Sequence, residues 1–174
     1  SGALLEVFQS SPHTFTANLT GGTNPVGIRV PGADEGGFAA WQARNFDLAA
    51  ILNGTVASAA GQPVADGVPN LLKYAFGIGP LDSPYARMPA TDLVSPLGQP
   101  LLRFRYHRLT ATDAPFYQIL VSPDLATWTP ADGALAPGEE TSPDPGGLTE
   151  TVTRYLPVQP SAPRRWLQLK VVQP

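Results

Sequence analysis

The sequence predicts a mainly β fold: an immunoglobulin- or fibronectin-like β-sandwich with two short helices inserted between amino-terminal and carboxy-terminal strands. Three observations lead to this prediction. Charged residues make up 14% of the 174-residue chain, against about 25% in an average soluble domain. The chain contains 20 Pro and 17 Gly, which favours turns over long amphipathic helices. Several short segments alternate apolar and polar residues with the period of two that a half-buried strand requires.

Residues 1–36 are predicted to form an amino-terminal group of strands. Alternation places strands at 4–8, 14–20 and 26–30, separated by turns that contain Ser, Gly and Pro. We expect these strands to complete the carboxy-terminal sandwich or to pair with a neighbouring subunit. The candidate residues for self-association are the apolar ones of the first two strands: Leu5, Val7, Phe15, Ala17 and Leu19.

Residues 37–80 are predicted to contain two helices. Apolar residues with helical spacing between 38 and 52 indicate one helix, capped by Asp34 or Gly37 and stopped at 53–54. A second helix of about two turns is expected to begin at Asn70 as its N-cap and to end at Gly77 in the left-handed conformation. Its apolar face would consist of Leu71, Leu72, Ala75 and Phe76.

Residues 81–100 contain four prolines and are predicted to form an extended connection without regular hydrogen bonding over most of its length. Residues 101–174 are predicted to form the sandwich domain, with strands at 102–107, 116–122, 149–156 and 165–172 and an acidic, Pro- and Gly-rich loop at 136–147. A sandwich of this kind needs about seven strands. The missing strands would therefore come from residues 4–30 of the same chain or of a neighbour.

Three segments after residue 37 carry a family pattern. They are Trp41 in the first helix, residues 66–77 (DGVPNLLKYAFG) followed by Pro80, and residues 122–128 (SPDLATW), after which residues 165–171 look like a closing strand. This part of the chain resembles the carboxy-terminal regions of large secreted proteins of Verrucomicrobia and related bacteria. The resemblance implies an extracellular or cell-surface location. The first 35 residues have no counterpart in that family.

The family commonly carries a calcium-type loop, Asp-Pro-Asp-Gly-Asp-Gly, before this helix, and the present chain departs from it. A loop of the EF-hand or dockerin kind places oxygen ligands at positions 1, 3 and 5 and a carboxylate at position 12. With Asp66 at position 5, these four positions hold Gln62, Val64, Asp66 and Lys73. Because Val cannot coordinate a metal and Lys brings a positive charge, we expect neither a metal site nor a cofactor.

Groups suited to acid-base catalysis are few. His13 and His107 are the only histidines, and both are interpreted as solvated structural residues. Glu139, Glu140 and Asp144 lie in a segment interpreted as a flexible acidic loop, whereas a glycosidase needs two carboxylates on a rigid scaffold. The sequence contains no nucleophile elbow, phosphate loop or zinc-protease motif. The chain is therefore predicted not to be an enzyme.

Two groups of residues are candidates for ligand binding. Arg103 and Arg105 could grip an acidic polysaccharide, but a row of Arg on an outward strand face also keeps a sheet edge soluble and unpaired. Trp166 lies on the outward phase of its strand and is the candidate platform for sugar stacking. The other tryptophans, Trp41 and Trp128, are expected to pack in the core.

The predicted function is that of a non-catalytic extracellular structural module for surface attachment or self-association, in which strand addition at an open edge builds a fibre. The alternative is a carbohydrate-binding module appended to a secreted polysaccharide-degrading enzyme. Expected partners are other copies of the chain, other cell-surface proteins or polysaccharide. A net charge of −3 disfavours nucleic acid, and no apolar run approaches the roughly 20 residues of a membrane helix. Residues 1–3 lack the features of a signal peptide, so the chain is expected to be a mature or excised piece of something longer.

Overall fold

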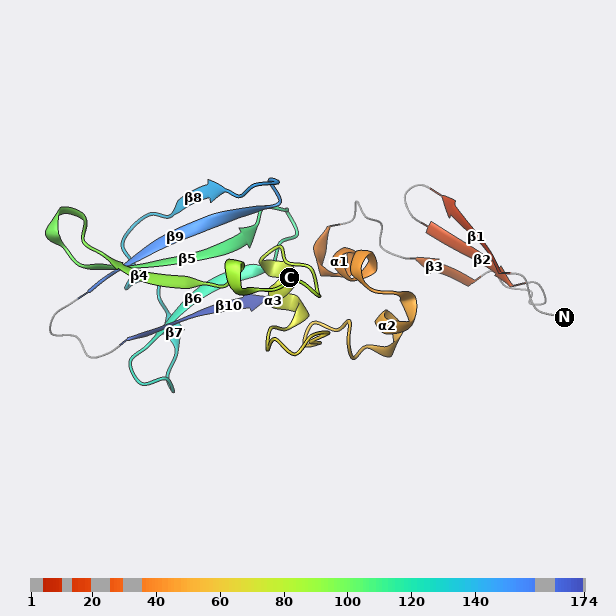
Figure 1. Cartoon of the computed structure of the whole chain (residues 1–174), viewed down its shortest axis with the longest axis horizontal. Helices are drawn as coiled ribbons and strands as arrows, with labels where there is room; N and C mark the ends of the chain where they lie inside the picture. Colours follow the sequence, from red (N-terminus) through yellow and green to blue (C-terminus); the bar gives the residue numbers. More distant parts are fainter. Residues whose placement is uncertain (1–4, 11–13, 20–25, 30–35, 159–164, 174) are drawn as a thin grey trace.

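The computed structural model describes residues 5–10, 14–19, 26–29, 36–158 and 165–173. Within these residues the chain is mainly β, with three antiparallel sheets and three short α-helices (Figure 1). The carboxy-terminal part holds a four-stranded and a three-stranded sheet, and the amino-terminal strands form a three-stranded sheet of their own. No helix in the described ranges has both the length and the apolar character that crossing a membrane requires.

The amino-terminal sheet has the order β1-β2-β3 and consists of β1 (Leu5–Ser10), β2 (Thr14–Leu19) and β3 (Val26–Arg29). The three predicted strands are confirmed, with small differences at their ends. The antiparallel register aligns Leu5 with Leu19 and Val7 with Ala17. In the described part of the chain these strands pair only with one another.

The single helix predicted between 38 and 52 is two helices, α1 (Gly37–Asn45) and α2 (Leu48–Asn53). Phe46 separates them because its backbone is extended, with φ −130° and ψ 149°. Asp47 then begins the second helix as its N-cap, and its Oδ1 accepts a hydrogen bond from the backbone N of Ala50 at 2.7 Å. A local cap therefore overrides the apolar spacing that suggested one continuous helix.

The ends of this helical pair were only partly predicted. Gly36 occupies the N-cap of α1, and Gly37 is its first helical residue. The other predicted cap, Asp34, lies outside the described residues. Gly54 ends α2 in the left-handed conformation, with φ 69°, as the sequence indicated.

The third helix, α3 (Asn70–Ala75), ends as predicted. Gly77 has φ 66°. The backbone N of Gly77 donates to Tyr74 O at 2.9 Å, and the N of Ile78 donates to Lys73 O at 2.8 Å. These two bonds form a Schellman motif, which satisfies carbonyls that the end of the helix leaves free.

The start of α3 differs from the prediction. Pro69 holds the N-cap position, and Asn70 is the first helical residue. The Asn70 amide instead donates to Val56 O at 2.7 Å and to Ser58 O at 2.9 Å, so it ties the preceding loop to the helix. The predicted apolar face is also incomplete, because Lys73 and Tyr74 are buried as well, at 0% and 5% exposed.

The Pro-rich segment contains a strand that was not predicted. Between the 3₁₀ turns Tyr85–Arg87 and Pro96–Gly98 lies β4 (Ala90–Val94), which pairs antiparallel with the following strand. Proline has no backbone N–H to donate to a strand ladder. The prolines of this segment flank β4 and do not interrupt it, and β4 lies at a sheet edge, where Pro is tolerated. The prediction of an extended connection is therefore wrong for these five residues.

The remaining strands are β5 (Leu101–Leu109), β6 (Phe116–Ser122), β7 (Thr129–Pro130), β8 (Glu140–Pro143), β9 (Thr149–Pro157) and β10 (Trp166–Val172). The four-stranded sheet has the order β4-β5-β9-β8 and the three-stranded sheet the order β10-β6-β7. The four strands predicted in 101–174 are confirmed. Since β4, β7 and β8 raise the total in residues 90–172 to seven, the inference that strands must be borrowed from residues 4–30 loses its premise.

One hydrophobic core lies between these two sheets. Phe104, Tyr106, Val152 and Leu156 from the four-stranded sheet are at most 4% exposed and pack with Ile119 of the three-stranded sheet. Leu167 and Leu169 of β10 pack against this core from its edge and are half-buried. The predicted inward and outward alternation of the long strands is confirmed.

Tyr117 connects the helical segment to the sheets. Its hydroxyl donates to Ala75 O at 2.6 Å at the end of α3 and accepts from the backbone N of Leu109 at 3.2 Å at the end of β5. Burial raises the pKa of this phenol to about 12. The side chain therefore stays a neutral donor and acceptor between two elements that are distant in sequence.

Candidate functional site

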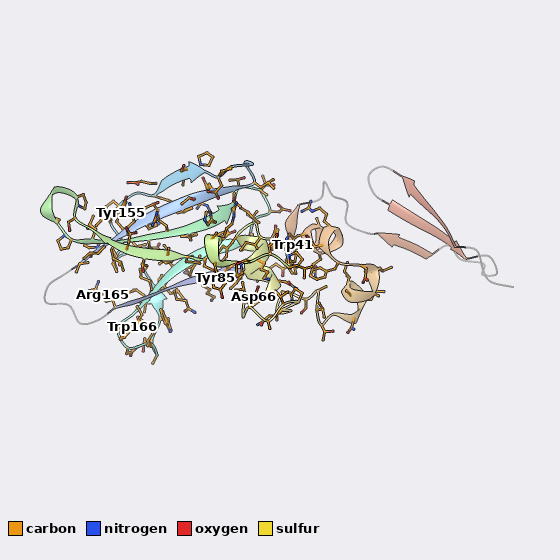
Figure 2. The ribbon with its side chains drawn as sticks, viewed as in Figure 1. Trp41, Asp66, Tyr85, Tyr155, Arg165 and Trp166 are labelled. Atoms are coloured by element: carbon orange, nitrogen blue, oxygen red, sulfur yellow. The ribbon has the colours of Figure 1, made fainter. Side chains whose placement is uncertain are left out.

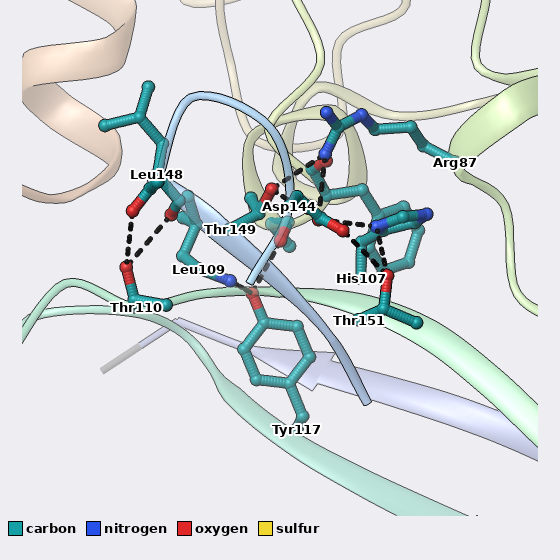
Figure 3. A network of polar contacts seen from close by, with 12 residues as sticks. Arg87, His107, Leu109, Thr110, Tyr117, Asp144, Leu148, Thr149 and Thr151 are labelled. Atoms are coloured by element: carbon teal, nitrogen blue, oxygen red, sulfur yellow. Dashed lines mark hydrogen bonds and ion pairs between the residues drawn. The ribbon is translucent and has the colours of Figure 1, made fainter. Parts of the chain in front are cut away.

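Asp144 lies at the centre of a polar network at one end of the four-stranded sheet (Figure 3). Its Oδ2 accepts hydrogen bonds from Thr149 Oγ1 at 2.7 Å and from Arg87 Nη1 at 3.3 Å. The same oxygen lies 2.7 Å from His107 Nδ1, while Oδ1 accepts from Thr151 Oγ1 at 2.7 Å. The carboxylate thus joins the 3₁₀ turn before β4 to strands β5 and β9.

The turn between β8 and β9 positions this carboxylate. The backbone N of Asp144 donates to Thr149 O at 2.9 Å, and the N of Gly147 donates to Asp144 O at 3.0 Å. Gly146 and Gly147 have φ values of 95° and 71°, a conformation that residues with a side chain rarely adopt. The consecutive glycines of the sequence are therefore what turns the chain sharply enough to point Asp144 into the network.

The network keeps Asp144 ionised. Burial alone would raise the pKa of this carboxyl, but hydrogen bonds from Thr149, Thr151 and His107 outweigh burial and lower the pKa to about 2. The side chain is only 8% exposed. The interpretation of this segment as a flexible acidic loop is therefore wrong, because the folded strands supply fixed donors to its acids.

The two glutamates of the same segment are also paired. Glu139 Oε1 accepts a hydrogen bond from Arg108 Nη2 at 2.9 Å, and its Oε2 lies 3.7 Å from Arg154 Nη1. Glu140 Oε2 accepts from the hydroxyl of Tyr155 at 3.0 Å. Each acid of the segment thus contacts β5 or β9, and the three carboxylates are held apart by different partners.

The geometry around His107 differs from that of a Ser-His-Asp triad. In a Ser-His-Asp arrangement the carboxylate and the nucleophile contact opposite ring nitrogens. Here Asp144 and the Thr151 hydroxyl, at 3.4 Å, both lie against Nδ1. A cleft of about 300 Å³ adjoins His107, and its other lining residues include Met88 and Ala90. His13, the second histidine, lies outside the described residues.

The two predicted arginines lie on the outer face of the four-stranded sheet and share one acid. Arg103 forms a bidentate pair with Asp92, with Nε to Oδ1 at 3.0 Å and Nη2 to Oδ2 at 2.5 Å. Arg105 Nη2 reaches the same carboxylate at 3.4 Å. The hydrogen bond from Arg103 lowers the pKa of Asp92. Because β5 is an interior strand, the interpretation of these arginines as guards of a sheet edge is wrong.

The three tryptophans have different environments, and Figure 2 labels two of them, Trp41 and Trp166. Trp41 is 7% exposed and stacks on Phe38 with ring centroids 5.5 Å apart, which confirms core packing. The expected core packing is wrong for Trp128, which is half-buried in a turn where its Nε1 donates to Leu125 O at 3.2 Å. Trp166 is half-buried at the start of β10, on the face opposite the core-packed Leu167.

The residues of the degenerate calcium loop form an internal ion pair. Lys73 is fully buried, and its Nζ lies 2.5 Å from Asp66 Oδ2 and donates to Pro80 O at 2.7 Å. The hydrogen bond between the Lys73 ammonium and the Asp66 carboxylate lowers the pKa of Asp66. Gln62 is exposed and Val64 is half-buried. The positive charge that faces the carboxylate of Asp66 thus comes from the ammonium group of Lys73, at position 12 of the loop.

The register of the amino-terminal sheet brings the predicted self-association residues together. Leu5, Val7, Ala17 and Leu19 are direct cross-strand partners, and Phe15 follows on the same face two positions from Ala17. The register of β3 adds two apolar residues to this face, Val26 opposite Ala17 and Ile28 opposite Phe15. Strand pairing of this kind is not visible in a local sequence pattern.

Sequence reasoning missed two polar features of the fold. Arg87 was not singled out, although it donates to the buried Asp144 that lies 57 positions further along the chain. Lys73 was judged only as a misfit for calcium, whereas its complete burial makes it part of the core. A signal was present in both cases: an isolated basic residue in an otherwise apolar or Pro-rich segment with few charges.

Comparison of the chain with protein-family models, with curated proteins and with solved structures finds no match in any of the three. The resemblance to the Verrucomicrobia proteins stays a prediction that depends on the quoted residues.

Proposed function

We propose that the chain is a non-catalytic structural module, extracellular or at the cell surface, that mediates surface attachment or self-association. We further propose that residues 90–172 form an immunoglobulin- or fibronectin-like sandwich. Its partners would be other copies of the chain or other cell-surface proteins.

The strand order supports the sandwich. An immunoglobulin domain has strands A, B, E and D in one sheet and C, F and G in the other, with C′ added beside C in variable domains. Taking β4 to β10 in sequence order as A, B, C, C′, D, E and F reproduces the order A-B-E-D in the four-stranded sheet. The three-stranded sheet then has the order F-C-C′, and β10 runs antiparallel to β6 as F does to C.

The observation that carries the proposed role is the face of the amino-terminal sheet on which the register gathers Leu5, Val7, Phe15, Ala17 and Leu19. A contiguous apolar face on a folded protein marks a surface that another surface covers. This sheet pairs with no other strand in the described ranges. A partner that packs on this apolar face would therefore bind chiefly through the hydrophobic effect.

The polar clusters support a structural role for the body of the module. Asp144 and His107 are engaged with each other and with the strands around them. Arg103 is neutralised by Asp92. These three groups, which could serve acid-base chemistry or anion binding, are thus engaged in contacts within the fold.

Self-association is tested by light scattering coupled to size-exclusion chromatography over a range of concentrations, with electron microscopy of the same samples. Ala17→Lys places a charge on the apolar face, and Thr16→Lys places the same charge on the opposite face of the same strand. We expect the wild type and T16K to assemble and A17K to be monomeric. A wild type that stays monomeric at every concentration contradicts the role in self-association.

A carbohydrate-binding module is the second candidate because Trp166 is accessible on the outer face of β10, between the exposed Arg165 and Gln168. A pull-down with insoluble polysaccharides compares wild type with Trp166→Ala. Binding that is lost in W166A would favour this function, and an absence of binding by wild type would contradict it.

A further inference from the structure

The three-stranded sheet has an open edge at β10. This strand pairs with β6 along its whole length, and its other side has no strand partner among the described residues. Its inward residues Leu167, Leu169 and Val171 are half-buried. By contrast, Phe104 and Val152 on the opposite sheet are 4% and 0% exposed. The core is therefore less covered along β10 than at its centre.

The inner face of the four-stranded sheet is also exposed to solvent at β4. Leu93 of β4 is the cross-strand partner of Leu102, which packs against the shared core, so both residues lie on the inner face of their sheet. Leu93 is nevertheless 65% exposed. Thr91, opposite the buried Phe104, is also exposed. Strand β4 thus extends beyond the three-stranded sheet that faces it.

Two contacts show that β4 and the open edge lie on the same side of the sandwich. Met88, which leads into β4, packs against the same buried cluster at the end of α3 as Leu169 and Val171 of β10. At the other side, Ala136 N, beyond β7, donates to Tyr155 O of β9. The cluster around α3 lies against the carboxy-terminal part of β10, because Leu169 and Val171 pack on it (Figure 1). In the sandwich topology the open side of β10 is the position of strand G.

We propose that this position accepts strand β1 from a second copy of the chain. The inference rests on the proposed self-association and identifies its acceptor. Strand β1 is an edge strand of its own sheet, and its six residues are close in length to the seven of β10. In its first half apolar Leu5 and Val7 alternate with Glu6, as a strand between a core and solvent requires, whereas Phe8 and Gln9 in its second half reverse this pattern.

Pairing of β1 with β10 continues the three-stranded sheet by one strand. Leu5 and Val7 then lie under Leu93, the residue that the present sheet leaves uncovered, and the backbone groups of both edges form a ladder. The contact joins different surfaces of the two copies. Because β1 of each copy and β10 of each copy are used once, the assembly is head to tail and produces an open chain of subunits.

The first test compares Leu93→Lys with Leu81→Lys by sedimentation velocity over a concentration series. Both leucines are exposed, by 65% and 71%, so neither charge disturbs the folded monomer, which circular dichroism would verify. We expect L93K to raise the concentration needed for assembly by at least about tenfold, since the lysine would be buried without a partner. L81K should assemble as the wild type does.

The second test uses cross-linking, for which the absence of cysteine from the sequence is an advantage. A mixture of Leu93→Cys and Val7→Cys proteins is treated with a short bismaleimide, and Glu6→Cys replaces Val7→Cys as the control from the opposite face. We expect mixed dimers with V7C and few with E6C. The double variant V7C/L93C should cross-link between chains.

The outcomes separate the two proposals. If wild type, L93K and L81K assemble equally and no mixed dimer forms, the β10 edge is not the acceptor while self-association stands. If wild type is monomeric throughout, both proposals are wrong. A cross-link confined to single chains of the double variant would overturn the second copy as the occupant.

Discussion

Replacing Asp144 by Asn is expected to destabilise the fold by an amount that depends on pH. Asn keeps the size of the side chain but removes the charge and one acceptor from the network around Thr149 and Thr151. The pKa of Asp144 is lowered from 3.8 to about 2 in the folded protein. One pKa unit corresponds to about 1.4 kcal/mol, so ionised Asp144 contributes about 2 kcal/mol to the free energy of unfolding.

The sign of the pH dependence follows from the direction of the pKa shift. Because the folded pKa lies below the unfolded value, the stabilisation by Asp144 is fully present above about pH 5 and is lost as the pH falls towards 2. The difference in stability between wild type and D144N should therefore be about 2 kcal/mol at pH 7. It should shrink as the pH falls through this window.

Urea denaturation followed by tryptophan fluorescence at pH 7, 5, 3 and 2 measures this difference. Asp132→Asn is the control, because Asp132 is an exposed acid of the same part of the chain. The reasoning is refuted if D144N is as stable as wild type at pH 7, or if its deficit is the same at pH 2 as at pH 7.

Three further predictions concern the helical segment. Asp66→Asn leaves the buried ammonium of Lys73 without its counter-charge and should lower the midpoint of urea denaturation, and adding Lys73→Met should restore most of the loss. A double variant as unstable as the single one would contradict this. Tyr117→Phe should lower the free energy of unfolding by about 1–3 kcal/mol and speed hydrogen exchange in α3. Unchanged exchange in α3 would count against the role of Tyr117 in linking α3 to the sheets. Gly77→Ala should cost more in thermal unfolding than Gly54→Ala: both have positive φ, but a Cβ at 77 would lie 2.7 Å from a threonine methyl while one at 54 would contact nothing within 4 Å. Equal costs would show that this close approach is relaxed.

The long strands could be predicted from sequence because their signal is local. In residues 102–107 the apolar residues alternate with Arg and His, and the structure places Phe104 and Tyr106 in the core as that pattern indicates. The left-handed glycines at 54 and 77 are of the same kind, because a positive φ is a property of one residue. These features need no knowledge of what the segment packs against.

The short strands could not be predicted because they exist only through pairing. Strand β4 has five residues, β8 four and β7 two, and each is formed by hydrogen bonds to a longer neighbour. None has enough residues to show a period. The helix break at Phe46 is similar, since apolar spacing continued through it while Asp47 supplied a competing cap.

The sequence by itself determined the β class, the long strands, the turns that glycine permits and the poor fit of one loop to calcium. Only the tertiary structure decided the pairing of Asp66 with a buried Lys73, the convergence of Arg87 and His107 on Asp144, and the uncovered position beside β10. The reason is physical. The first group depends on backbone conformation and on the apolar period of a single segment, whereas the second depends on burial and charge contacts between segments that meet only when the whole chain has folded.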